Sequence, residues 1–472
     1  MKTSLESLPK APISKDFFTD PFAFLARART EFGDAFAIAE SRAIFSRSDT
    51  CCGVVAVFGA ERQRQVLSDT DAFVMPRSAA LKLSLPERLV NLNRGLHSMS
   101  GSEHAGHKRM VARVLRSTIS ASQWANVATV VSEYTQRWKP GNTISLLNEM
   151  RQLTLRIAAD ALLGQSGDEN SDLASLLHTY FFLRRESSSP FVAVRPEVLE
   201  QLTMVGQRLD EALRQRIRQH RNAKYYAPGS LLHSLAIAGT AGKWDLSEDE
   251  IVGHINVLFI SSTEPIAISL TWLLLVLSQR PDIRKGLRAE MANGCGDPMI
   301  AAGTPLLDNV VNETLRLLTP NALMVRITSR PVSLQGLSLP AGTEVVLCPF
   351  LAHREAHVFP DPNLFLPARW SVAKPTAYEY FPFGAGGHAC VGLSLALLLV
   401  KSTISELVRK FDLVLANEQP IDWRVDIQLM PRNEPVLSVH EVGGSRATHS
   451  PTWSGPVREL LHFPIIVDTP SK

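Results

Sequence analysis

The amino-acid sequence predicts one large, mostly α-helical domain of the α+β class with small β-sheets. Three observations support this prediction. Apolar residues recur at helical spacing over most of the chain. Short β-like segments occur toward the two ends, and no linker or internal repeat divides residues 1–442. A chain of 472 residues, 45% of them hydrophobic, is long enough to bury a large core.

The elements of the first half follow from local patterns. Residues 21–32 predict a helix, because their apolar residues follow helical spacing and Gly33 supplies a glycine cap. Residues 35–44 and 53–58 predict short strands. Further helices are expected over residues 102–115, 146–163, 195–219 and 248–280. The last of these contains the most apolar stretch of the chain, residues 266–277, which predicts a buried helix because a membrane span needs about 18 apolar residues.

The C-terminal third is more mixed. Residues 306–318 predict a helix that ends before Pro320, because proline disfavours helix in the residue before it. Two β-like segments follow at residues 332–339 and 343–347, joined by a turn at 340–342. From residue 443 the composition becomes linker-like, so we expect residues 443–472 to form an extension of unknown role.

Charge and cysteine content limit the possible partners and location. The formal net charge is +3 and no basic block occurs, which argues against a nucleic-acid partner. Five cysteines, an odd number without a C-x-x-C pair, favour a reducing, cytoplasmic setting. The first residues contain no apolar segment of the signal-peptide kind. We therefore expect a cytoplasmic monomer with no membrane span.

One loop carries the strongest chemical signal. In FPFGAGGHACVG, residues 381–392, the residues Phe383, Gly386, Cys390 and Gly392 form the pattern F-x-x-G-x-x-x-C-x-G before an apolar helix. Glycines let backbone amides approach a thiolate, which is the form of cysteine that binds metal. One sulfur cannot complete a zinc or iron–sulfur site, but it can be the axial ligand of a haem. A dinucleotide fingerprint over residues 384–389 fails, because no β-branched strand precedes it.

This loop resembles the haem-binding loop of the cytochrome P450 family, and the resemblance spans about residues 15–440. It implies the cytochrome P450 fold, with haem b enclosed between a long distal helix and the helix after the cysteine loop. Cys390 would be the iron ligand. Glu313 and Arg316, three residues apart on one helical face, would join Arg369 in a buried structural clamp.

The resemblance also implies the remaining cofactor contacts. Phe383, Gly386 and Gly392 would shape the cysteine loop. The haem propionates would be held by His104, Lys108, Arg326 and His388. His104 and Lys108 lie four residues apart, so one helical face presents both.

The distal helix departs from the family, which usually has an acid followed by threonine at its centre. Here the acid position is Glu264 and the alcohol position is Pro265. We expect Glu264 to be the proton-relay acid and Ser261, one turn earlier, to be a substitute hydroxyl donor. Proline lacks an N–H group, so we also expect the helix to kink at this point.

The leading functional prediction is a haem-thiolate monooxygenase that inserts oxygen from O2 into a small hydrophobic substrate, either a secondary metabolite or a lipid-like molecule. Electrons would come from a separate ferredoxin or flavodoxin-type protein. Its predicted docking cluster contains Lys108, Arg109 and Arg113. The mainly apolar substrate pocket is expected to be formed by residues 77–97, 253–259, 321–325 and 428–430.

Two alternatives remain open. Because Pro265 replaces the oxygen-activating threonine, the chain could be a peroxide-dependent or redox-neutral haem-thiolate enzyme of the peroxygenase, isomerase or dehydratase type. The other alternative is a non-catalytic haem-binding or ligand-sensing module, which the acid at position 264 disfavours.

Overall fold

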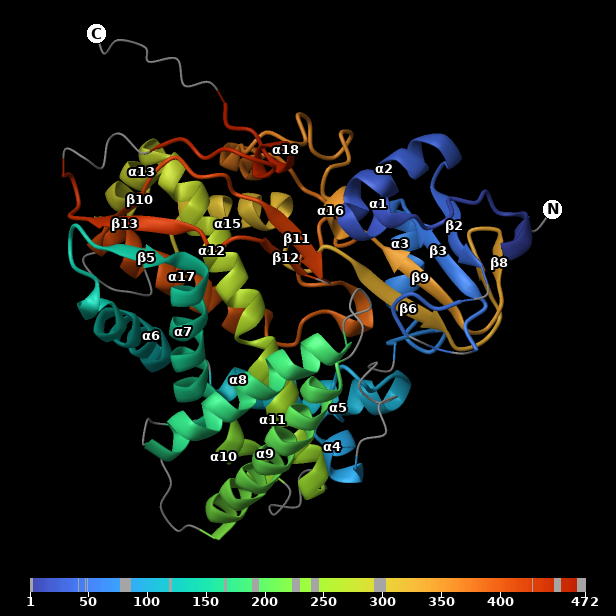
Figure 1. Ribbon diagram of the computed structural model, residues 1–472, viewed down its shortest axis with the longest axis horizontal. Coiled ribbons are helices and arrows are strands. Elements are labelled where there is room, and N and C mark those ends of the chain that lie inside the picture. Colours follow the sequence, from blue (N-terminus) through green and yellow to red (C-terminus); the bar gives the residue numbers. More distant parts are fainter. Residues whose placement is uncertain are drawn as a thin grey trace.

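The computed structural model confirms the predicted α+β class. Its described residues are all except 1–2, 41, 47, 49, 77–85, 119–120, 165–167, 189–194, 223–229, 239–245, 293–302, 427, 445–450 and 465–472. Figure 1 shows two regions, a bundle of helices and a smaller mixed sheet that is covered on one side by the N-terminal helices. Two clusters of buried apolar residues correspond to these regions, a large one through the helices and a smaller one at the sheet.

The main sheet combines strands from residues 35–74 with strands from residues 324–347. Its five strands lie in the order β2 (Ala35–Glu40), β3 (Gly53–Val57), β9 (Thr343–Leu347), β6 (Met324–Thr328) and β4 (Phe73–Val74). Strands β3 and β9 run parallel and are buried along their whole length, as expected for central strands. Helices α1 (Lys15–Thr19) and α2 (Pro21–Phe32) lie beside this sheet (Figure 1). The pairing places Arg326 in β6, opposite Val345.

The predicted helices are present with shifted ends. They are α5 (Gly101–Thr118), α7 (Leu146–Ala158), which continues as a π-helical turn over Ala159–Leu163, α9 (Pro196–Asn222) and α15 (Pro305–Leu317). Sequence patterns missed α6 (Ala121–Tyr134), α8 (Asp168–Ser188), α10 (Leu231–Ala238) and α13 (Pro281–Ala292). The strand expected over residues 332–339 is a hairpin of β7 (Val332–Leu334) and β8 (Leu337–Leu339), because Gln335 and Gly336 adopt positive φ.

The long distal helix is two helices rather than one kinked helix. α11 (Glu248–Ser261) and α12 (Glu264–Gln279) are separated by Ser262 and Thr263. Pro265 lies in the first turn of α12, where its missing N–H would have no helical acceptor in any case. Proline therefore helps to start a new helix here, which corrects the expectation of a kink within a continuous one.

Together α11 and α12 form the apolar centre of the molecule. Within the described ranges, only this 32-residue segment is long and apolar enough to cross a membrane, and 78% of its most apolar window is buried inside the protein. Burial of this kind is what a core helix shows, in agreement with the sequence prediction. α11 begins with a capping box, in which the Ser247 hydroxyl accepts from the Glu250 amide and the Glu250 carboxylate accepts from the Ser247 amide.

The remaining elements close the fold around α17 (Leu393–Lys410), which follows the cysteine loop. One sheet contains β10 (Asp412–Leu415), β13 (Val436–His440) and β5 (Thr143–Ser145), and a hairpin contains β11 (Trp423–Asp426) and β12 (Gln428–Pro431). Part of the predicted extension belongs to the main core. Residues 451–464 include α18 (Val457–Leu460), and Trp453, Val457 and Leu461 are buried among core residues.

Candidate functional site

The cysteine loop adopts a closed turn that only its glycines allow. Gly384 and Gly386 have φ of 68° and 66°, and a Cβ on Gly386 would lie 2.0 Å from the carbonyl oxygen of Leu67. The amide of Cys390 donates to the carbonyl of Phe383 at 2.8 Å, which closes the loop. The side chain of Phe383 packs against the large core. The structure therefore assigns a physical role to each loop residue that the pattern identified on this side of the cysteine.

The Cys390 thiol lies in crowded surroundings, although the residue keeps some exposed surface. Burial raises its pKa, while the amide of Gly392 and the ammonium of Lys108 act in the opposite direction. In the polypeptide alone, desolvation therefore outweighs the stabilisation of the thiolate by the Gly392 amide and Lys108. A bound metal ion, which deprotonates a coordinating thiol outright, would reverse that balance.

Lys108 contacts the loop backbone rather than a carboxylate. Its Nζ donates to the carbonyls of Gly387 and Ala389 at 2.7 and 2.6 Å. These bonds attach helix α5 to the segment just before Cys390. In the structure the Lys108 ammonium braces the loop, and its predicted contact with a propionate stays a prediction.

Three other predicted residues form a basic cluster beside this loop. The rings of His104 and His388 lie 3.9 Å apart between centroids. Burial, followed by neighbouring basic groups that include Arg326, lowers the pKa of His104 to about 4 and that of His388 to about 3. Arg326 is only 3% exposed, and burial lowers its pKa to about 10. No carboxylate within the described part of the chain pairs with it. His388 Nε2 is buried and has no hydrogen-bond partner there.

His97 also belongs to this cluster, although sequence reasoning included it only as the last residue of a pocket segment. Burial, followed by the charges of Arg184, His104 and Arg326, lowers its pKa to about 4. His97 and Cys390 both keep exposed surface in crowded surroundings. No local motif marks a histidine of this kind, because its meaning depends on β6 and α8, which are distant in sequence.

The cluster has the chemistry that the predicted haem requires. A buried guanidinium is costly without an anionic partner, and buried polar nitrogens need acceptors or donors. Two propionates would satisfy Arg326, His104 and His388, while Cys390 offers the axial thiolate. The residues present therefore fit haem b, with Lys108 supporting the loop.

The predicted arginine–glutamate clamp is confirmed. Glu313 and Arg316 are 0% exposed, and Arg316 Nε and Nη2 each donate to the Glu313 carboxylate at 2.9 Å. Arg369 Nε, Trp370 Nε1 and the Leu366 amide donate to the same carboxylate at 2.9, 3.0 and 2.8 Å. One carboxylate thus accepts five hydrogen bonds and fixes residues 366–370 against α15.

Glu264 lies in an ion-paired cluster rather than free in the distal site. It is 2% exposed, and its carboxylate accepts from Arg151 on α7 at 3.0 and 2.5 Å and from Arg185 on α8 at 3.3 Å. Arg185 also donates to the sulfur of Met430 at 3.4 Å. The predicted role of proton-relay acid is not favoured by this geometry, because guanidinium donors occupy both oxygens. The cluster instead ties the start of α12 to two neighbouring helices.

The hydroxyls at the helix break are also engaged. Ser261 Oγ donates to the Val257 carbonyl at 2.7 Å, Ser262 Oγ to Phe259 at 2.8 Å and Thr263 Oγ1 to Ile260 at 3.1 Å. To act as the substitute donor that the sequence predicts, Ser261 would first have to break this bond to Val257. Within the described chain, no backbone amide donates to the carbonyls of Ser261 or Ser262, so the break presents acceptors instead of a donor.

The predicted pocket segments are partly brought together. Asn321 forms a β-bridge with Gln428, and the Leu429 amide donates to the Pro320 carbonyl at 2.9 Å. Gly253 of α11 packs so closely against residues 91–94 that a Cβ there would lie 1.8 Å from the Arg94 carbonyl oxygen. Residues 77–85 of the first predicted segment lie outside the described residues.

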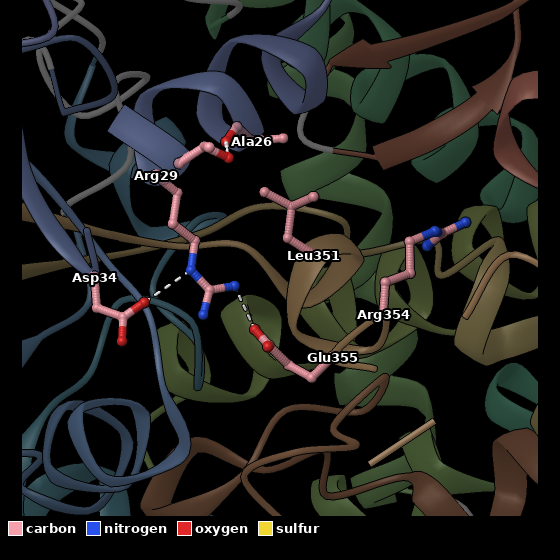
Figure 2. A pocket seen from close by; sticks show the side chains of 7 residues that line it. Ala26, Arg29, Asp34, Leu351, Arg354 and Glu355 are labelled. Carbon is pink, nitrogen blue, oxygen red and sulfur yellow. Dashed lines mark hydrogen bonds and ion pairs between the residues drawn. The ribbon is translucent and has the colours of Figure 1, made fainter. Parts of the chain in front are cut away.

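A different hollow, with a volume of about 350 Å³, lies between α2 and α16 (Pro349–Ala352). Figure 2 shows the side chains that line it. Arg29 pairs there with Asp34 at 2.8 Å and with Glu355. It contains none of the predicted site residues, so it is separate from the candidate site. The seven residues that line it are Ala26, Arg29, Thr30, Asp34, Leu351, Arg354 and Glu355.

Comparison with known proteins identifies the family. A family model described as Cytochrome P450 matches residues 42–436. The chain is similar to cyclooctat-9-en-7-ol 5-monooxygenase of Streptomyces melanosporofaciens, at 27% identity over 340 residues, covering 66% of this chain and 72% of that one. It is also similar to mitochondrial 25-hydroxyvitamin D-1 alpha hydroxylase of Mus musculus, at 32% identity over 177 residues, covering 36% and 35%.

Two solved structures share the fold. Retinoic acid bound cyanobacterial CYP120A1 aligns with a TM-score of 0.74 and 21% identity, covering 90% of this chain and 96% of that one. The cytochrome P450DA heme domain aligns with a TM-score of 0.75 and 18% identity, covering 92% and 97%. At this identity the likeness concerns the fold alone.

Proposed function

The chain belongs to the cytochrome P450 family, as a monooxygenase with haem b as its cofactor, and we propose that it inserts one oxygen atom of O2 into a small hydrophobic substrate. The observation that carries this proposal is Cys390 in its closed loop beside a buried basic cluster without a described acidic partner. When bound, a haem with a cysteine ligand supplies the electron donation that favours O–O cleavage.

We propose distinct tasks for the residues around this cofactor. Cys390 would bind the iron, and Arg326, His104 and His388 would pair with the propionates. Lys108 would hold the loop through its two carbonyl contacts. The Glu313 clamp would keep residues 366–370, and the loop that follows them, in place without touching the reacting atoms.

Proton handling is proposed to depend on the helix break. Ser261 and Ser262 present carbonyl oxygens to which no described amide donates, and such acceptors hold water well. Water bound there would deliver protons in place of the missing threonine hydroxyl. Glu264 would position the break through Arg151 and Arg185 rather than donate a proton itself.

The substrate is proposed to be hydrophobic, either a secondary metabolite or lipid-like. Leu323, Leu429 and Met430 are buried and come from the segments expected to form the pocket. Relatives named for cyclooctat-9-en-7-ol and for 25-hydroxyvitamin D agree with an apolar substrate class. Trp272 donates from Nε1 to the Leu429 carbonyl at 3.0 Å, which fixes this wall to α12.

A peroxide-dependent or redox-neutral reaction is the second candidate, and a specific observation favours it. Pro265 has no hydroxyl, and that of the nearest substitute, Ser261, already donates to Val257. A reaction that bypasses O2 activation would need neither a hydroxyl at position 265 nor the hydroxyl of Ser261. The third alternative, a non-catalytic module, is set aside, because the family assignment makes this chain an enzyme.

Electrons are proposed to come from a separate ferredoxin or flavodoxin-type protein that docks near α5. Lys108 reaches the cysteine loop from this helix, and Arg109 and Arg113 are exposed on it, one turn apart. An acidic partner would be steered to such a face. We also propose that the protein is cytoplasmic, as the cysteine content suggests, and that it is a monomer.

The iron ligand can be tested directly. Reduced protein treated with carbon monoxide should show the red-shifted Soret band of a thiolate-ligated haem, and Cys390→His should lose it. Retention of that band in the variant would place the ligand elsewhere. Product analysis with O2 and reductant, compared with added hydrogen peroxide and with neither, then distinguishes the three reaction types.

A further inference from the structure

Residues 451–464 lie beyond the part of the chain that the family model matches, and they contact both the end of α12 and the segment that contains the arginine–glutamate clamp. We propose that this segment, called the C-terminal brace below, fixes the end of α12 relative to the arginine–glutamate clamp. It would thereby hold the haem-binding loop at a set distance from the distal helix. This inference requires only that haem is bound at Cys390, and not any particular substrate or oxidant.

The first attachment of the brace is to the end of α12. Gln279, the last residue of that helix, donates from Nε2 to the Pro451 carbonyl at 3.1 Å and accepts from the Trp453 amide at 3.0 Å. An amide side chain that pairs with backbone in both directions mimics a short strand pairing and fixes two positions at once. Gln279 is 15 residues from Glu264, about 22 Å along the helix. Its anchoring therefore sets the direction of α12 relative to the break.

The second attachment is to the segment that contains the clamp. The Phe365 amide donates to the His462 carbonyl at 2.8 Å, and the His462 amide donates to the Asn363 carbonyl at 2.8 Å. The carbonyl of Leu364, between these residues, accepts from both Arg316 and Arg369 of the clamp. The brace thus pairs as an added strand with the very backbone that the clamp holds.

Arg354 links the brace to both sides of this arrangement. Its Nη2 donates to the carbonyls of Leu460 in the brace and Leu317 at the end of α15, at 2.7 and 2.8 Å. Its Nε donates to Asn363 Oδ1 at 3.1 Å. Figure 2 shows that its side chain points away from the neighbouring ion pair of Arg29 and Glu355. Burial lowers the pKa of Arg354 to about 9, so the surrounding acceptors, one of them from the brace, are needed to hold its charge.

Apolar contacts hold the brace in the core between these attachments. Trp453 is 3% exposed and stacks on Phe463 with ring centroids 5.2 Å apart. Phe463 meets Phe365 edge to face at 5.9 Å. A loosely attached tail would not bury a tryptophan in this way, because ordering it costs conformational entropy that burial must offset.

The experiment measures haem release into excess apomyoglobin from the full-length holoprotein and from single variants. Trp453→Ala should speed release about tenfold, since it removes the central aromatic contact. Gln279→Ala, which breaks only the α12 attachment, should speed release about threefold. Glu459→Ala changes an exposed residue of α18 and is the matched control that should release haem at the wild-type rate.

A second control separates bracing from general stability. Leu339→Ala creates a cavity in the smaller core cluster, away from the brace, and should lower the unfolding temperature as Trp453→Ala does without speeding haem release. Wild-type release rates in both Trp453→Ala and Gln279→Ala would overturn the proposal, as would release from Leu339→Ala as fast as from Trp453→Ala.

Discussion

Removal of the Glu313 carboxylate should be the most damaging single change that leaves the cysteine loop itself intact. In Glu313→Ala, five hydrogen-bond donors lose their acceptor, four of them on Arg316, Arg369 and Trp370. The guanidinium of Arg316 is 0% exposed and that of Arg369 is 6% exposed, so water does not readily replace the lost partner. Both charges would then remain in the interior without their common counter-ion.

The magnitude follows from the cost of breaking a buried ion pair, which is about 3–5 kcal/mol for one partner removed. Two guanidiniums share Glu313, so the upper part of that range is expected. Domains are stable by only about 5–15 kcal/mol, and the loss is therefore a third or more of the total. We expect poorly soluble protein with little bound haem. Glu313→Gln should be intermediate, because the amide keeps the shape and part of the acceptor capacity but not the charge.

The assay is the haem-to-protein ratio after purification, together with urea unfolding of whatever folds. Glu133→Ala is a suitable control, because Glu133 on α6 pairs with Arg156 on α7 with both side chains about half exposed, and such surface pairs contribute at most about 1 kcal/mol. A Glu313→Ala protein that is soluble, fully loaded with haem and only slow in turnover would refute the structural role of the clamp.

Three further outcomes are expected. Pro265→Thr should raise the ratio of product formed to reductant consumed, and an unchanged ratio on a substrate without polar groups would show that the missing hydroxyl does not matter. Glu264→Gln should lower the free energy of unfolding by about 3–5 kcal/mol, because Arg151 and Arg185 lose their counter-ion; normal stability with slow turnover would restore Glu264 as a proton-relay acid. Burial holds the pKa of His353 at about 3, below its ordinary value of about 6.5, so the folded state binds fewer protons than the unfolded state between these pH values. Stability should therefore fall as the pH is lowered through this window, and His353→Asn should reduce the slope, measured by urea unfolding, by about 1.4 kcal/mol per pH unit.

The parts of the site that depend on short sequence patterns could be predicted from the sequence. The cysteine loop is a contiguous motif, and the structure explains its glycines by positive φ at Gly384 and Gly386 and by the close approach of Leu67. The prediction of the clamp was also correct, because Glu313 and Arg316 share a helical face and the family resemblance indicated Arg369. Two of the missed helices, α8 and α10, have weak local signals. In α8, apolar residues lie on all sides and no stripe marks the buried face.

Charged partners distant in sequence were not predictable. Glu264 pairs with residues 113 and 79 positions away, and nothing around SSTEP indicates arginines on α7 and α8. Lys108 was placed near the haem by its position, but its acceptors are the backbone carbonyls of Gly387 and Ala389, which carry no residue-type signal. The sequence predicted that Glu264 and Lys108 lie near the haem site. Which atoms they contact depends on the fold.

The break between α11 and α12 shows why that distinction matters for mechanism. Three hydroxyl residues in succession suggest a supply of proton donors, yet each donates to a carbonyl of the preceding turn. A hydroxyl has one proton, so for Ser261 to donate elsewhere it must first break its 2.7 Å bond to Val257, at a net cost of about 0.5–1.5 kcal/mol. It can accept a hydrogen bond without that cost. A threonine placed at position 265 would restore a backbone N–H as well as a hydroxyl, and the Ser261 carbonyl, four residues earlier, accepts from no described amide. The restored N–H can bond to that carbonyl, which leaves the hydroxyl available as a donor. Pro265→Thr therefore adds a donor of a kind that this part of the chain does not otherwise offer, which is why its effect on coupling discriminates between water-borne and hydroxyl-borne protons.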